Sequence, residues 1–163
     1  MTTVSAIRKP AGVAETSKVQ RLSTDFLNRY NEALMLIELA ADDSSAIDDL
    51  KNWRGLGYRE HFEVSALRCA ASALAAYDAV VPARRAGFEE LCRTMARLVV
   101  TATALLAEKR AGLEPQMIVS ITGEALRRQI GRATQFINAN GTLDIGSIES
   151  RALQDEIDAL LAR

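Results

Sequence analysis

The chain has 163 residues, of which 48% are apolar and 25% are charged, and its 20 basic and 21 acidic residues leave a formal net charge of −1. A single domain of this length can bury a core without metal ions or disulfides. The balanced charge excludes a general electrostatic attraction to nucleic acid or to anionic membranes, so we expect neither as a partner.

The first 17 residues are small and polar and are interrupted by Pro10 and Gly12. They predict a flexible N-terminal arm, residues 1–17, followed by one domain over residues 18–163. The arm lacks the apolar core of a secretory signal, and no apolar run is long enough to span a bilayer. With only two cysteines in the chain, this pattern favours a cytoplasmic protein with reduced thiols.

Helical periodicity begins at about residue 18, and apolar residues at three- and four-residue steps predict a first helix that ends near residue 40. Near its end, Met35, Leu36 and Leu39 project away from the main apolar stripe, so this end of the helix is apolar nearly all round. A short serine-capped helix is predicted next, over residues 44–53.

Four further helical segments are delimited by glycine and proline. They cover residues 58–80, 83–110, 115–139 and 147–163. The last segment has a narrow apolar seam that includes Leu153, Ile157 and Leu160. No convincing alternating strand pattern occurs. The sequence therefore predicts an all-α, single-domain helical bundle of about five to six helices, mostly antiparallel.

The only histidine, His61, lies in the helix predicted over residues 58–80, on a polar strip with Ser65, Arg68 and Ser72. The plain interpretation is a solvent-facing strip. The functional alternative is a site for a small anion or polar ligand, in which Arg68 supplies a permanent charge, His61 titrates near neutral pH and the serines donate hydrogen bonds.

Motifs for catalysis and cofactor binding are missing. The chain has no GxxxxGK[ST] or GxGxxG loop, no GxSxG elbow and no CxxC pair, and its one histidine and two cysteines are too few for a structural zinc site. The residues after His61 lack the lysine and glycine of histidine phosphotransfer domains. We therefore expect no cofactor and no metal. Cys69 and Cys92 fall on predicted core faces and are expected to be buried and inert.

These observations favour a non-enzymatic helical interaction protein, such as a regulator, adaptor or small chaperone, that self-associates as a homodimer. The candidate contact surfaces are the apolar end of the first helix and the seam of the last one. The alternative for both is burial within a single chain. A sensor of a small polar ligand or anion at the His61 strip is the second hypothesis, and an enzyme is the third.

Overall fold

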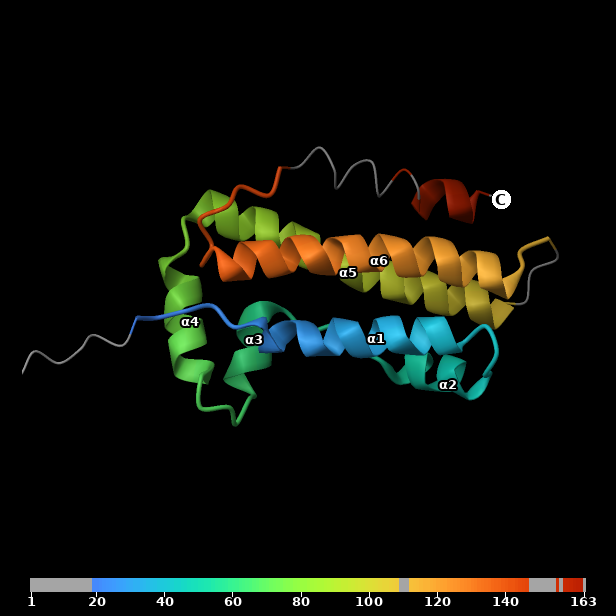
Figure 1. Cartoon of the computed structure of the whole chain (residues 1–163), viewed down its shortest axis with the longest axis horizontal. Helices are drawn as coiled ribbons and strands as arrows, with labels where there is room; N and C mark the ends of the chain where they lie inside the picture. Colours follow the sequence, from blue (N-terminus) through green and yellow to red (C-terminus); the bar gives the residue numbers. More distant parts are fainter. Residues whose placement is uncertain (1–18, 109–111, 147–154, 156, 163) are drawn as a thin grey trace, which may run out of the picture.

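The computed structural model describes residues 19–108, 112–146, 155 and 157–162 (Figure 1). Every regular element in these ranges is helical, which confirms the predicted all-α class. The elements in chain order are the 3-10 helix η1 (Thr24–Leu27), α1 (Asn28–Leu39), α2 (Ser45–Asn52), α3 (Tyr58–Glu63), α4 (Ala70–Ala79), α5 (Pro82–Glu108) and α6 (Pro115–Asn138). Residues 157–161 form a further helical turn. The predicted arm 1–17 and Leu153 lie outside the described residues.

The long helices α5 and α6 form an antiparallel hairpin, and α1 lies along it, antiparallel to α6 (Figure 1). Helix α2 folds back against α1 and α5, while α3 and α4 close the end of the bundle where α1 begins. The buried apolar residues of these helices form one hydrophobic core. The predicted helical bundle is therefore confirmed for the described part of the chain.

The single helix predicted over residues 58–80 is wrong, because the chain leaves the helical conformation between α3 and α4. In this connection the Ser65 hydroxyl accepts a hydrogen bond from the backbone N–H of Leu67 at 3.1 Å. Such a local bond offers the backbone an alternative to the helical ladder. As a result Val64 and Leu67, which a continuous helix would pack on an apolar surface, are 74% and 42% exposed.

The end of α6 anchors the segment that precedes η1. Asn140 and Gly141 both have positive φ, +51° and +76°, and the Gly141 N–H donates to the carbonyl of Phe136 at 2.9 Å. The Asn140 side chain accepts a hydrogen bond from the N–H of Leu22 at 2.8 Å and donates one to the carbonyl of Gln20 at 3.2 Å. The predicted stop of this helix is confirmed, and the turn also joins two distant parts of the chain.

All aromatic residues of the chain belong to one connected, buried cluster, although they make up only 5% of the sequence. Its members are Phe26, Tyr30, Trp53, Tyr58, Phe62, Tyr77, Phe88 and Phe136. Phe88 of α5 stacks on Phe136 of α6, with ring centroids 4.5 Å apart and planes 11° apart. Rings from η1 and from every α-helix except α2 therefore meet near the end of the bundle that α3 and α4 close.

The last helical turn packs within the chain. Ile157 and Leu160 are only 3% and 6% exposed, and Ile157 shares a surface hollow with Ala96 and Val100 of α5. These two seam residues, proposed from the sequence as contacts with another molecule, are covered intramolecularly.

Candidate ligand pocket

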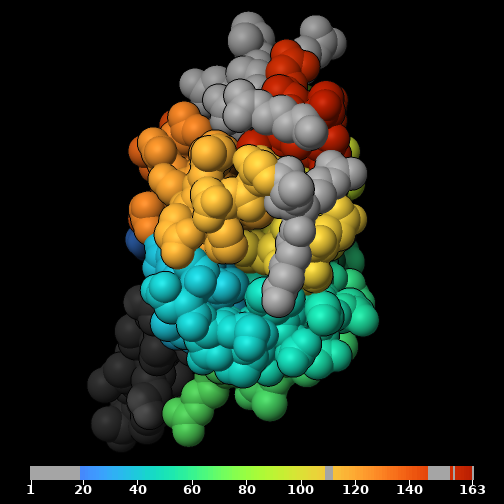
Figure 2. Space-filling view, turned by 90° about the vertical axis from the view of Figure 1, so that its right-hand side faces the viewer, coloured from blue at the N-terminus to red at the C-terminus, as the bar shows by residue number. Residues whose placement is uncertain are grey.

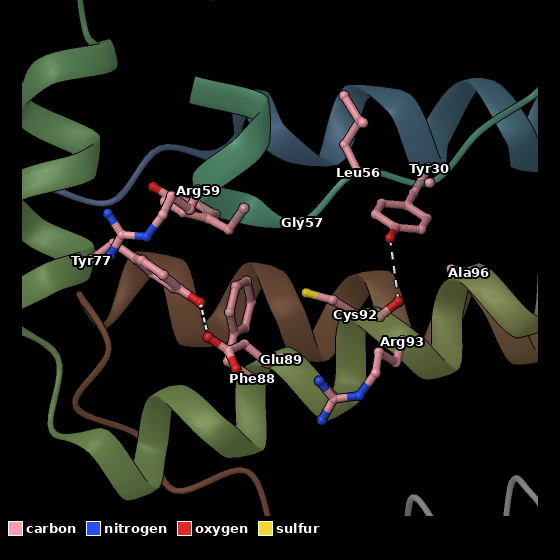
Figure 3. A pocket seen from close by; sticks show the side chains of 12 residues that line it. Tyr30, Leu56, Gly57, Arg59, Tyr77, Phe88, Glu89, Cys92, Arg93 and Ala96 are labelled. Atoms are coloured by element: carbon pink, nitrogen blue, oxygen red, sulfur yellow. Dashed lines mark hydrogen bonds between the residues drawn. The ribbon is translucent and has the colours of Figure 1, made fainter. Parts of the chain in front are cut away.

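A cavity of about 420 Å³ lies between α5 and the loop and helices that precede it (Figure 3). Sites for small molecules typically have volumes of about 300–1,000 Å³. The lining residues come from α1, the loop 55–57, α3, α4 and α5, and they are Tyr30, Gly55, Leu56, Gly57, Tyr58, Arg59, Tyr77, Phe88, Glu89, Cys92, Arg93 and Ala96. The cavity is therefore built by elements that are far apart in sequence.

Four aromatic residues are among those that line the cavity, and each comes from a different helix. Tyr30, Tyr58, Tyr77 and Phe88 are supplied by α1, α3, α4 and α5, and none is more than 3% exposed. The glycine loop can approach α5 closely because a Cβ atom at Gly55 would lie only 3.2 Å from the Cβ of Ala96. The lining is predominantly apolar.

The three tyrosine hydroxyls are held by hydrogen bonds. Tyr77 donates to the carboxylate of Glu89 at 2.6 Å, and Tyr30 donates to the backbone carbonyl of Cys92 at 3.3 Å. The Tyr58 hydroxyl accepts from the N–H of Ser23 at 2.9 Å. Burial raises the pKa of Tyr58 to about 12 and also raises the pKa values of Tyr30 and Tyr77, so all three phenols are neutral at physiological pH.

Cys92 projects from α5 into the same wall (Figure 3) and is only 7% exposed. Burial raises the pKa of its thiol, with a smaller contribution from the charge of Glu89. Because the thiolate is the reactive form, this cysteine is a poor nucleophile. The predicted burial of Cys92 is confirmed. The predicted burial of Cys69 is wrong, because the break between α3 and α4 leaves that residue exposed.

Charged side chains line the rim. Arg59 forms an ion pair with Asp78 and lies 5.6 Å from the centre of the Tyr77 ring. Arg93 pairs with Glu90 at 2.8 Å, and this interaction is the main cause of the lowered pKa of Glu90. The two cations at the rim are thus already neutralised by acids that do not line the cavity.

The four residues of the predicted polar strip do not lie on one helix. His61 lies on α3, where its Nε2 is 3.1 Å from a carboxylate oxygen of Asp25 and its ring packs edge-on against Phe26 and Phe62. It therefore ties α3 to η1.

The other members of the strip lie beyond the end of α3. Ser65 stabilises the α3–α4 loop, and Arg68 is exposed in that loop. Ser72 lies on α4 and accepts a hydrogen bond from the N–H of Arg21 at 3.3 Å. None of the four lines this cavity, and the continuous helix that would align them is interrupted between α3 and α4, so a ligand-binding role for these residues stays a prediction.

The comparisons with known proteins give no further guidance. No protein family, curated protein or solved structure matches the chain. Among the described residues, no helix is long and apolar enough to cross a membrane, and no group of three or more histidine, cysteine, aspartate or glutamate side chains could hold a metal ion.

Proposed function

We propose that the chain binds a small, mainly apolar organic molecule in the cavity lined by Tyr30, Tyr58, Tyr77 and Phe88. The cavity itself is the observation that supports this function. Its volume suits a small molecule, its lining is mainly apolar, and the hydroxyls of Tyr30 and Tyr77 are fixed by hydrogen bonds. Apolar pockets with a few well-placed polar groups are the usual form of small-molecule sites. Neutral phenols and a neutral thiol supply shape and hydrogen bonds for holding a ligand.

Such a ligand would act as a regulator by linking the helices that surround the cavity. It would touch α1, α3, α4 and α5 at once, and α3 and α4 form the closing end of the bundle (Figure 1). A ligand stabilises the conformation that it binds. We therefore propose that occupancy holds α3 and α4 against α5. Both cysteines are free thiols, which supports a reducing compartment, the cytoplasm, as the place of action.

The test is a variant that fills the cavity, Cys92→Leu, with 2-phenylethanol as the probe. When the concentration of free 2-phenylethanol is about 100 times Kd, we expect the free energy of unfolding of the unmodified protein to rise by about 2.7 kcal/mol. Its Tm should rise by about 5–10 °C. Cys92→Leu should lose this shift because the added carbon atoms occupy the space beside Phe88. Isothermal titration calorimetry checks the affinity directly.

The matched control is Cys69→Leu, which makes the same substitution at an exposed loop position and should leave binding unchanged. Cooperative unfolding of Cys92→Leu establishes that the variant is folded. A folded Cys92→Leu protein that still binds the probe with unchanged affinity would show that the cavity is not the site. Absence of binding to the unmodified protein would contradict the proposal outright.

A second function, self-association, is supported by the apolar end of α1. Met35 and Leu39 lie one helical turn apart and are 52% and 49% exposed, and Leu36 is half-buried beside them. This part of α1 and its neighbour α2 lie side by side on the end of the molecule seen in Figure 2. We propose that this surface pairs two copies of the chain about a twofold axis, so that one patch covers the other. The dimer would be the form in which the protein acts as a regulator or adaptor.

The expected result is that Met35→Glu together with Leu39→Glu converts a dimer into a monomer with unchanged helicity, because two charges would enter the interface. Light scattering measures the mass, and circular dichroism measures the helicity. Val64→Glu places the same charge at a residue that is 74% exposed in a loop and should remain dimeric. A monomeric mass for the unmodified protein at high micromolar concentration would refute self-association.

A further inference from the structure

The charged side chains at the cavity mouth differ in how they are paired. Arg59 and Arg93 each have an acidic partner, Asp78 and Glu90 respectively. Glu89 is different, because among the described residues no ion pair joins its carboxylate to a basic side chain. The cavity therefore presents one acidic group whose charge is not already neutralised by a direct contact.

The Glu89 carboxylate is also held in place. It accepts the 2.6 Å hydrogen bond from Tyr77, whose ring is 3% exposed and stacks on Tyr58 at 4.8 Å. Figure 3 shows this bond beside the Phe88 ring, at the edge of the cavity. A charged group that is fixed before binding loses little freedom when a ligand arrives. In contrast, Arg93 is paired at 2.8 Å with Glu90, which does not line the cavity.

The aromatic wall suits a cation. The guanidinium groups of Arg59, which lines the cavity, and of Arg85, which does not, lie 5.6 and 5.8 Å from the centre of the Tyr77 ring, so this ring already attracts cations of the chain itself. Positive charge is attracted to the faces of aromatic rings. Tyr30 and Phe88 add two more rings to the same cavity.

From this arrangement we propose that the ligand is an organic cation, with a protonated amine that contacts the carboxylate of Glu89 and an apolar body that packs against the lining at Leu56, Tyr58 and Ala96. This assignment rests on the proposed binding function and specifies the chemical class of its ligand. An anionic ligand would have to draw Arg59 or Arg93 from an existing partner and would also face the charge of Glu89.

Three probes of similar size and shape separate these possibilities: 2-phenylethylammonium, neutral 2-phenylethanol and anionic phenylacetate. Calorimetric titration at pH 7 and low salt should show that the ammonium binds about tenfold more tightly than the alcohol, and that phenylacetate binds most weakly. Glu89→Gln should reduce the affinity for the ammonium to that for the alcohol, while the affinity for the alcohol is unchanged. Glu124→Gln, at an exposed acid on α6 that does not line the cavity, should have no effect.

Each alternative result has a distinct meaning. Equal affinities for the ammonium and the alcohol would overturn the cationic ligand while leaving binding in the cavity intact. Tightest binding of phenylacetate would overturn it in favour of recognition by the rim arginines. An ammonium preference that survives Glu89→Gln would remove the assigned role of that carboxylate. Failure of all three probes to bind would overturn both this inference and the proposed function.

Discussion

Replacing Phe88 by alanine should lower the free energy of unfolding by about 3–5 kcal/mol, the usual cost of removing a fully buried aromatic ring. The ring has 0% exposure and stacks on Phe136 of α6. It also lies 5.9 to 6.5 Å from the rings of Phe26, Tyr58 and Tyr77, which come from η1, α3 and α4. Losing Phe88 would therefore remove contacts among five elements at once.

Urea denaturation followed by circular dichroism measures this effect. Val100→Ala is a suitable control on the same helix, because that side chain is 63% exposed, and its effect should stay within about 0.5 kcal/mol. A loss of less than about 1 kcal/mol in Phe88→Ala would contradict the central place of this ring in the core.

Gly141→Ala should destabilise the protein by about 2–4 kcal/mol, because two separate costs combine. The residue has a φ of +76°, a conformation that is unfavourable for alanine. In addition, a Cβ atom at this position would lie 2.5 Å from Cγ2 of Val80 and 3.5 Å from Cδ1 of Leu22. Chemical denaturation should show the loss together with a weakened junction between the end of α6 and the segment before η1.

Gly131 offers the matched control, because it is exposed inside α6 and an added Cβ atom would meet nothing within 4 Å. Gly131→Ala should raise the free energy of unfolding by about 1 kcal/mol, the ordinary difference in helix propensity. The same substitution is thus expected to have opposite signs at two positions ten residues apart. A neutral Gly141→Ala variant would mean that the turn tolerates a side chain and is not the tight junction seen here.

Apolar periodicity and the positions of glycine and proline predicted the structure correctly where one helix face or one helix end is concerned. The apolar stripes of α5 and α6, the start of α6 at Pro115 and its stop before Gly141 were predicted because helical period and backbone freedom are local properties. The break after α3 was missed because the residues around Ser65 are compatible with a helix by composition. In the structure, the helix is interrupted at this point by the hydrogen bond from the Leu67 N–H to the Ser65 hydroxyl and by the docking of α3 on η1.

The sequence by itself determined the helical class, the main helices and the burial of Cys92, since these depend on the spacing of apolar residues along one segment. Only the tertiary structure decided the site. Periodicity places Tyr30, Tyr77 and Phe88 on apolar helix faces, but it does not indicate that these residues and Tyr58 meet around one cavity. Likewise, the pairing that leaves Glu89 without a basic partner among the described residues depends on distances between elements, and such distances are set by how the helices pack.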